Sequence, residues 1–411
     1  MVGAGVAGLT AAYLLQRRYD VLLFESAPRL GGHAHTHDLP TSDGRLVAVD
    51  SGFIVHNERT YPNLLRLFGE LDVATQETEM SMSVRCDGCG LEYAGARGLT
   101  GLFPRAANAF TPRYLRMLTE VKRFHRLARR VLVDGDDTRT LGAFLAAGRF
   151  SDYFVRHFAL PVVSAVWSAG ERLSREYPAR YLFAFLENHG LLSVTGSPTW
   201  RTVTGGSRTY VDRAVKALSA VHVSTPVRAV HRAPDGVTLR DDADETYLVD
   251  RVVIATHPDQ ALALLADPTE AERATLGAFR YSRNETVLHT DAAVLPRAAG
   301  ARASWNYRKS SCGDETGPVA VTYDMNRLMR LAEPVDYLVS LNADDVPESA
   351  VLARMTYEHP EYTVDSVAAQ QRLPELNDGR TAFAGAYHGW GFHEDGCASG
   401  VRAAASLGVG W

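Results

Sequence analysis

The spacing of hydrophobic residues at the start of the chain predicts a helix followed by a buried strand. Residues 6–15 place apolar side chains at helical intervals, and residues 20–25 then form a short apolar run that ends in an acid. A continuous apolar run is typical of a strand buried on both faces of a parallel sheet. Its alternation with a helix indicates a βαβ unit, so the pattern predicts an α/β fold.

The middle of the chain follows two other patterns. Residues 60–195 are mainly helical in their periodicity, as the run at 112–132 illustrates. Residues 266–375 alternate strand-like runs, such as 285–291 and 318–326, with turn-forming residues. Short runs separated by turns predict an antiparallel sheet, which we expect to be capped by helices.

Three glycines before the first helix add a chemical function to this pattern. Gly3, Gly5 and Gly8 form a Gly-x-Gly-x-x-Gly motif, and Glu25 follows Gly8 by 17 residues. In a dinucleotide-binding unit, these glycines make a tight turn, admit the pyrophosphate and let helix and strand pack closely. The phosphates face the helix N-terminus, and the acid accepts hydrogen bonds from ribose hydroxyls. Only two residues precede the motif, so we expect the natural chain to start upstream.

Composition narrows the class of protein without changing this picture. The 411 residues, 46% hydrophobic and 22% charged, predict a two-domain globular protein, which we expect in the cytoplasm. The formal charge of −5 gives no reason to expect nucleic acid as a partner. We expect no signal peptide, and the apolar run at 158–170 is shorter than a membrane span of about 20 residues. We interpret that run as a buried helix or as the wall of an apolar tunnel.

Cysteines and histidines raise the question of a metal site. Cys86 and Cys89 have the spacing of half a zinc site, but no second pair with suitable spacing follows, so we expect a turn there. Four cysteines in a long chain do not make a disulfide framework, which fits a reducing compartment. His33, His35 and His37 alternate, so an extended strand would place them on one face, as a metal site requires.

The glycine pair before these histidines favours a cofactor over a metal. Gly31 and Gly32 follow Arg29 soon after the second strand, and they leave room for backbone beside cofactor phosphates. Flavoproteins have such a pair, whereas a simple NAD dehydrogenase does not. We therefore predict no metal ion and expect His33 to donate a hydrogen bond to the cofactor.

The chain resembles the FAD-dependent amine oxidase, phytoene desaturase and protoporphyrinogen oxidase superfamily from end to end. The blocks that carry the resemblance lie at residues 3–32, 199–218, 221–239, 249–258 and 381–408. A narrower likeness, in stretches such as DSGFIVHNERTYPNL and GFHEDG, links the chain to a bacterial subgroup of FAD-binding oxidoreductases. Some members of that subgroup are associated with modified fatty acids, and it has some likeness to flavin-dependent fatty acid double-bond isomerases.

The resemblance implies non-covalent FAD in a discontinuous Rossmann-type domain of the glutathione reductase kind. That domain would comprise residues 1–59, 196–265 and 376–411, and an α+β substrate domain would comprise 60–195 and 266–375. The implied cofactor contacts, besides the five glycines and His33, are Glu25, Arg29, Gly52, Phe53, Val227, Thr256, Gly385, Asp395, Gly396 and Cys397. Free N–H groups around residues 395–397 would face the flavin's pyrimidine edge, where negative charge develops on reduction.

Side chains near the implied flavin edge are the candidate reactive groups. Flavin carries the redox chemistry, so the protein supplies orientation, electrostatics and exclusion of water. The candidate catalytic residues are His56, Tyr61, Tyr387, His388 and His393. The candidate substrate contacts are Asn57, Trp305, Tyr307, Tyr323 and Trp390. The alternative is that His56 and Asn57 cap a loop and that the aromatic residues on strands belong to the core.

Many apolar candidates and few charged ones favour a hydrophobic substrate. Amine oxidases commonly place a lysine near flavin N5, and the matching strand here, residues 282–291, contains none. We therefore expect an FAD-dependent oxidoreductase that desaturates, reduces or isomerises a fatty-acyl or lipid-like chain by hydride transfer. A protein that acts on such a chain is also expected to contact a lipid surface peripherally. Two alternatives stay open: an amine oxidase that makes imine and hydrogen peroxide, and a non-catalytic FAD-binding partner protein. The oligomeric state is left open.

Overall fold

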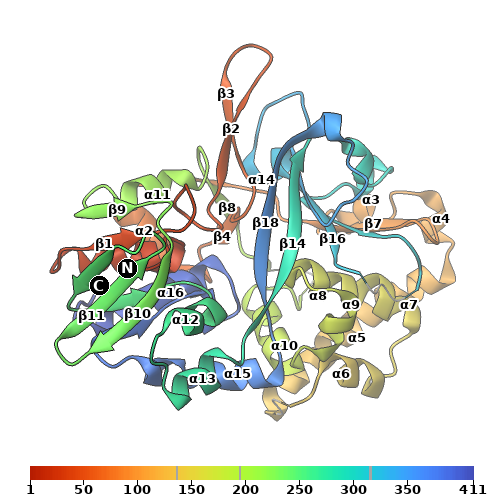
Figure 1. Ribbon diagram of the computed structural model, residues 1–411. Helices are drawn as coiled ribbons and strands as arrows, with labels where there is room; N and C mark the ends of the chain where they lie inside the picture. The colour runs from red at the N-terminus through yellow and green to blue at the C-terminus, as the bar shows by residue number, and fades with distance from the viewer. Residues whose placement is uncertain (136–137, 194–195, 314–316) are drawn as a thin grey trace.

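The molecule has two halves, which meet along a pair of long strands (Figure 1). The computed structural model describes residues 1–135, 138–193, 196–313 and 317–411. Residues 194 and 195, where the first insertion is expected to end, lie outside these ranges. Strands β14 (Arg280–His289) and β18 (Val351–Glu361) pair antiparallel along almost their whole length and run between the halves.

The first half is built on a parallel sheet. Its parallel pairs are β1 (Leu22–Phe24) with β9 (Ala220–His222) and β13 (Val252–Ile254) with β19 (Thr381–Phe383). Val2 joins the pairs, because it bridges both Phe24 and Ile254. Helices α1 (Val6–Leu15) and α16 (His393–Ser406) pack against each other on this sheet, and α1 is buried along nearly its whole length. The predicted helix and strand are confirmed, and so is the α/β class.

Smaller elements surround the parallel sheet. An antiparallel sheet contains β10 (Val227–Ala233), β11 (Gly236–Asp241) and β12 (Thr246–Val249). A hairpin of β2 (Thr36–Pro40) and β3 (Leu46–Asp50) projects at the top of Figure 1. A third small sheet contains β4 (Val55–Asn57), β8 (Trp200–Val203) and β5 (Thr75–Glu77). The helices here are α2 (Pro62–Glu70), α11 (Arg208–Ala214), α12 (Pro258–Leu264), α13 (Glu270–Leu276) and α15 (Val364–Gln370).

The second half is built on a mixed sheet of seven strands. In order, they are β18, β14, β17 (Leu338–Leu341), β16 (Ala320–Asp324), β15 (Trp305–Lys309), β6 (Met82–Cys86) and β7 (Leu91–Gly95). Neighbours are antiparallel except β15 and β6, which run parallel. The sheet predicted for residues 266–375 thus gains a hairpin from the first insertion, which the helical interpretation of 60–195 missed. Both hairpin strands are buried on both faces, so they lack the alternation that marks a half-exposed strand.

Helices of the first insertion complete the second half, most of them at the lower right of Figure 1, with α3 and α4 above them beside β7. They are α3 (Gly98–Leu102), α4 (Ala106–Ala109), α5 (Pro112–Asp134), α6 (Leu141–Ala147), α7 (Asp152–Phe154), α8 (Leu160–Trp167), α9 (Glu171–Glu176) and α10 (Ala179–Asn188), with a π-helical turn η1 (Val155–Ala159). Phe124 lies at the centre of their core and contacts the rings of Phe144 and Phe183 edge-on. No helix in the described ranges is both long and apolar enough to cross a bilayer.

Candidate active site

The glycine motif forms a cradle at the N-terminus of α1. Gly3 has a φ of +95°, and a Cβ there would lie 2.7 Å from the Ala255 carbonyl oxygen. A Cβ on Gly8 would lie 2.0 Å from the Gly3 carbonyl oxygen, so the helix and the loop touch at this point. Gly5 differs, because nothing lies within 4 Å of the position its Cβ would take. The loop therefore has open space above Gly5, where a pyrophosphate could approach the backbone.

The residues around the cradle hold its shape. The Glu25 carboxylate accepts hydrogen bonds from the backbone N–H of Ala4 (2.8 Å) and Ala27 (2.9 Å). The Arg29 guanidinium donates to the carbonyl oxygen of Gly32 at 2.8 Å, and a Cβ on Gly32 would lie 3.1 Å from the Gly5 Cα. Glu25 and Gly32 line the cavity described next, whereas Arg29 and Gly31 lie behind them. Arg29 thus supports the second glycine loop from outside the cavity.

A cavity of about 1370 Å³ extends from this cradle into the second half of the molecule. Predicted cofactor residues that line it are Gly3, Gly5, Glu25, Gly32, His33, Gly52, Phe53, Val227, Thr256 and Gly385. Its far part is lined by side chains of the insertion helices, among them Leu118, Val121, Phe124, Phe158, Val162 and Val166. The apolar run at 158–170 is therefore both a buried helix and a wall of the cavity.

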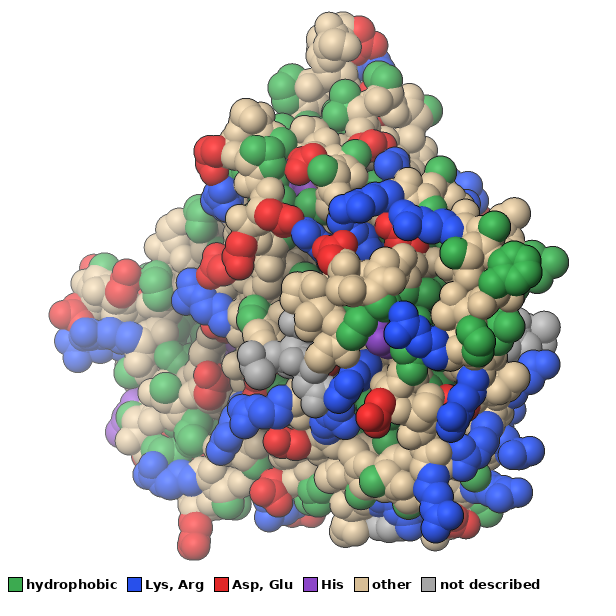
Figure 2. All heavy atoms as spheres, turned by 90° about the vertical axis from the view of Figure 1, so that its right-hand side faces the viewer, with side chains coloured by type: hydrophobic (Ala, Val, Ile, Leu, Met, Phe, Trp, Pro, Cys, Tyr) green, Lys and Arg blue, Asp and Glu red, His purple; other side chains and the backbone are tan. Residues whose placement is uncertain are grey.

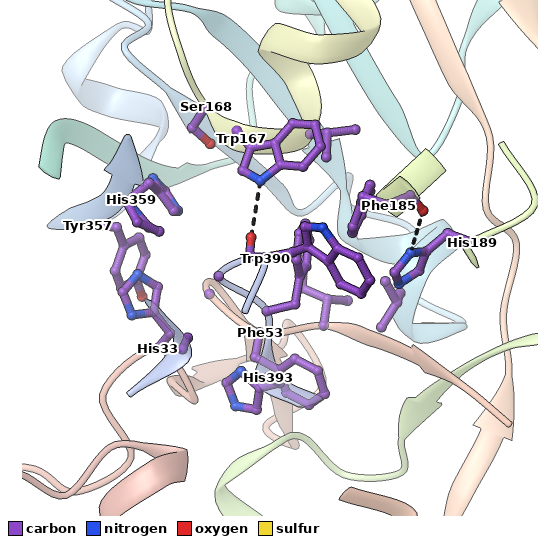
Figure 3. Close-up of a pocket in the computed structure, with 18 of the residues that line it drawn as sticks. His33, Phe53, Trp167, Ser168, Phe185, His189, Tyr357, His359, Trp390 and His393 are labelled. Atoms are coloured by element: carbon purple, nitrogen blue, oxygen red, sulfur yellow. Dashed lines mark hydrogen bonds between the residues drawn. The ribbon is translucent and has the colours of Figure 1, made fainter. Parts of the chain in front are cut away.

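Aromatic rings divide the cavity where its two parts meet. Figure 3 shows Trp390 between two groups, with His33, Tyr357 and His359 on one side and Phe185 and His189 on the other. The Trp390 carbonyl oxygen accepts a hydrogen bond of 3.1 Å from the indole N–H of Trp167, which belongs to α8. The rings of Trp390 and Phe185 lie 5.9 Å apart. This arrangement gives the middle of the cavity a rigid aromatic lining.

His393 is the predicted catalytic residue with the best-defined surroundings. Its ring stacks on Phe53 at 3.7 Å between centroids, and its Nε2 lies 3.0 Å from the Tyr210 hydroxyl. Burial lowers the pKa of His393 to about 3, with a smaller contribution from His56. The imidazole is therefore neutral near pH 7, and it can orient groups or exchange a hydrogen bond at the cavity wall.

The helix that starts at His393 contains residues 395–397, whose N–H groups are expected to face the flavin. The Gly396 N–H donates to the Phe392 carbonyl oxygen at 3.1 Å, so it takes part in the first turn of this helix. Asp395 caps the helix by accepting the Phe392 N–H at 2.9 Å, and burial raises the Asp395 pKa to about 7. A Cβ on Gly396 would lie 2.6 Å from Val6. Asp395, Gly396 and Cys397 do not line the cavity.

The three alternating histidines do not converge on one point: the rings of His35 and His37 lie 4.1 Å apart, while His33 faces Tyr357 and His359. His33 lines the cavity, and its Nε2 has no hydrogen-bond partner among the described residues. His35 Nδ1 lies 3.0 Å from the Tyr357 hydroxyl, and His37 Nε2 lies 2.9 Å from Ser51 Oγ. Burial, with a smaller contribution from the neighbouring His359, keeps the His33 pKa well below its usual range. Because His35 and His37 have other partners, the free nitrogen of His33 faces the cavity without them, as the predicted hydrogen bond to a cofactor requires.

Four other candidates do not line the cavity. Strand β4 points Val55 into the cavity, so its neighbour His56 faces the opposite way, against Phe68. Asn57 accepts the N–H groups of two loop residues, which matches the alternative of a loop cap. Tyr307 donates from its hydroxyl to Glu171 (3.2 Å) in the core. His388 is half-buried beside Tyr387, and its buried Nε2 has no partner among the described residues.

The remaining candidates do line the cavity, together with residues that the sequence did not single out. The predicted catalytic or substrate residues in the lining are Tyr61, Tyr387, His393, Trp305, Tyr323 and Trp390. Added to them are Trp167, Phe185, His189, Tyr357 and His359. Of these, only Tyr357 and His359 are connected by their spacing in the sequence, because they lie two residues apart on one strand and so share a face. The others reach the cavity through helix packing, which no short motif encodes.

Comparisons with known proteins now place the chain. Residues 6–288 match the flavin-containing amine oxidoreductase family. The chain belongs to this family. Among solved structures, cyclohexylamine oxidase from Brevibacterium oxydans IH-35A superposes with a TM-score of 0.70 at 18% identity, covering 99% of this chain and 97% of that one. Putrescine oxidase bound to putrescine gives 0.68 at 16% identity, with coverage of 99% and 97%. The CLA-producing fatty acid isomerase from P. acnes gives 0.66 at 15% identity, with coverage of 97% and 96%.

As a member of this family, the protein is an FAD-dependent oxidoreductase. The residues present fit FAD, because the open space at Gly5, the acid at Glu25 and the unpartnered His33 nitrogen face one elongated cavity. The glycine cradle would hold the diphosphate, and Glu25 would bind ribose hydroxyls. FAD supplies the capacity to accept or return a hydride, while the chain's aromatic lining excludes water and orients the substrate.

The buried histidines of this site predict acid sensitivity. Burial lowers the pKa of His359 to about 4, whereas an unfolded histidine has a pKa near 6.5. The unfolded state therefore binds the extra proton first, and stability present above pH 6.5 is lost as the pH falls toward 4. We expect His359 to account for about 2 kcal/mol of lost stability at pH 5.

Urea unfolding at pH 7.5 and pH 5 measures this contribution. The variant His359→Gln should lose less stability than the wild type between the two pH values. The exposed His231, changed to glutamine in a matched control, should leave the pH dependence unchanged. An identical pH dependence in His359→Gln and the wild type would show that the His359 pKa is ordinary.

Proposed function

We propose that this oxidoreductase acts on a fatty-acyl or lipid-like chain, introducing, removing or shifting a double bond. The observation that carries the proposal is the charge of the cavity lining. Its charged side chains, within the described ranges, are Glu25, Lys122 and Glu358. Glu25 belongs to the cofactor cradle, and Glu358 lies 3.2 Å from His257. The part of the cavity between the insertion helices thus presents aliphatic and aromatic groups and one cation, which suits an apolar chain with an anionic end.

Lys122 marks where the cavity opens. The side chain is exposed and also lines the cavity, so the cavity reaches the surface beside α5. The other exposed basic residues of this helix are Arg113, Arg116, Arg126, Arg129 and Arg130, while Glu120 is buried. Figure 2 shows Lys and Arg side chains gathered over the lower part of the face that carries these helices. Such a face attracts an anionic substrate and repels a protonated amine, and it also supports contact with an anionic lipid surface.

A second candidate function is amine oxidation. The family match and the fold likeness to cyclohexylamine oxidase favour it, and aromatic rings can bind a cation. The fold likeness to a fatty acid isomerase and the missing lysine in β14 favour the first proposal. Palmitate, oleate and linoleate should be tested under air and with a reductant, and cyclohexylamine and putrescine with detection of peroxide. Turnover of the amines without any change in the acyl chains would replace the first proposal with the second.

The charge at the cavity opening gives a sharper test. Changing Lys122→Glu should raise KM for a carboxylated acyl substrate about tenfold, with a much smaller change in kcat. The effect should shrink at high salt, because an exposed charge is screened. Lys216→Glu is the matched control, since Lys216 is also exposed but does not line the cavity. Equal KM values for both variants would show that Lys122 takes no part in substrate binding.

A further inference from the structure

Four metal-ligating side chains come together at the far edge of the mixed sheet. They are Cys86, Cys89, His157 and Cys312, and their ligand atoms all lie within 4.8 Å of one another. The sequence predicted a turn at the two nearby cysteines, because no second pair followed at a suitable spacing. The missing ligands are supplied instead by two distant segments of the chain. None of the four residues lines the cavity of the active site.

The sheet itself brings the three cysteines together. Cys86 ends β6, and Cys89 lies in the turn that leads to β7. Strand β15 runs parallel to β6 with Lys309 opposite Cys86, so the residues after β15 continue beside the turn. A Cβ on Gly88 would lie 2.8 Å from the backbone nitrogen of Cys312, which shows how closely the two segments approach. Cys86 Sγ and Cys312 Sγ are 3.6 Å apart.

His157 is oriented for the same point from the opposite side. It lies in the π-helical turn η1, a conformation that often marks functional positions. Its Nδ1 lies 3.0 Å from the Tyr153 carbonyl oxygen, and its Nε2 lies 3.6 Å from Cys89 Sγ. Donation from Nδ1 to a carbonyl is the usual arrangement behind a metal-binding histidine, because it fixes the ring and leaves Nε2 as the ligand.

We propose that Cys86, Cys89, His157 and Cys312 bind one zinc ion. Three sulfurs and one imidazole are a common ligand set for tetrahedral structural zinc. With Zn–S bonds near 2.3 Å, a tetrahedral site separates its ligand atoms by about 3.7 Å, close to the two distances of 3.6 Å. Soft thiolates favour zinc over magnesium or calcium. A closed set of four protein ligands, away from the active-site cavity, indicates a structural role.

The ion would fasten the helical insertion to the sheet. The Tyr93 hydroxyl of β7 already donates to the His157 carbonyl oxygen at 2.7 Å, so helix and strand are in contact at this point. Zinc would add a link between η1, the β6–β7 turn and the segment after β15. Because helices of the insertion also line the cavity, this link would hold the cavity wall in place without taking part in the reaction.

Metal analysis of the FAD-loaded protein tests the site. Protein produced with zinc in the medium should contain one zinc per chain after dialysis. Replacement by Co²⁺ should produce the visible absorption of a tetrahedral thiolate site. Cys312→Ser and His157→Ala should each lose the metal on dialysis against a chelator. Cys397→Ser is the matched control and should keep it, because Cys397 is a buried cysteine elsewhere in the fold.

The wild-type protein decides the matter even if the variants fail to fold. Folded, FAD-loaded wild type that contains no zinc and takes up neither Zn²⁺ nor Co²⁺ after thiol reduction would overturn the proposal. A disulfide between Cys86 and Cys312 in the unreduced protein, found by mass spectrometry, would also overturn it. Stoichiometric iron in place of zinc would show that the cluster binds metal but that the assignment to zinc is wrong.

Discussion

Replacing Gly5 by valine is expected to give a folded protein that no longer retains FAD. The space around the Cβ position of Gly5 is open, and Gly5 has a φ of −71°, so a side chain strains neither packing nor backbone. The new side chain would instead project into the space that a pyrophosphate needs. We expect FAD affinity to fall at least 100-fold, about 2.7 kcal/mol, as measured by flavin absorbance after gel filtration and by titration of the apoprotein.

Two further substitutions separate cofactor binding from folding. Gly8→Val should prevent folding, because its Cβ would lie 2.0 Å from a backbone oxygen of the same loop. Gly69→Val is the neutral control, since Gly69 is exposed on α2 with nothing within 4 Å of its Cβ position. Circular dichroism should find Gly5→Val and Gly69→Val equally folded. Full flavin content in Gly5→Val would place the diphosphate elsewhere.

The cofactor side of the molecule could be predicted from sequence because its chemistry is local. The roles of Gly3, Gly5 and Gly8 follow from a motif of six residues, and Glu25 lies one strand away. Gly3, Gly5 and Glu25 line the cavity, whereas Gly8 makes the close contact between helix and loop that the motif predicts. The contacts expected at residues 395–397, none of which lines the cavity, depend on where a helix begins, and a sequence pattern places helix boundaries less exactly than it places helices.

The substrate side resisted prediction because long-range packing places its residues. Trp167, Phe185 and Tyr357 come from two helices and one strand, and no spacing in the sequence connects them. His56 was misplaced by a single residue of strand alternation, which turned it away from the cavity. The Cys86 cluster shows the same limit, since His157 and Cys312 lie far from Cys86 and Cys89 along the chain. Local sequence patterns thus predict the cofactor-binding residues but not the residues that the two insertions bring together.

A buried ion pair next to this cluster carries the second large expected effect. Lys309 is completely buried and its ammonium contacts the carboxylate of Glu171, which is 2% exposed as a side chain. Tyr307, a predicted substrate contact, donates to the same carboxylate at 3.2 Å. Breaking a buried ion pair by removing one of its members costs about 3–5 kcal/mol. We therefore expect Lys309→Met to lower the free energy of unfolding by about that amount.

A double-mutant cycle, measured by urea unfolding, separates the interaction between Lys309 and Glu171 from the packing of each side chain. Glu171→Met should cost a similar amount, but Lys309→Met with Glu171→Met should cost much less than the sum, because two apolar side chains replace two buried charges. The exposed pair of Arg17 and Glu70, joined at 2.6 Å, is the control, and breaking it should cost less than about 1 kcal/mol. Additive losses in the buried cycle would mean that each residue stabilises the fold through its own contacts. Strong coupling would instead identify the ion pair as the interaction that fixes β15 against α9.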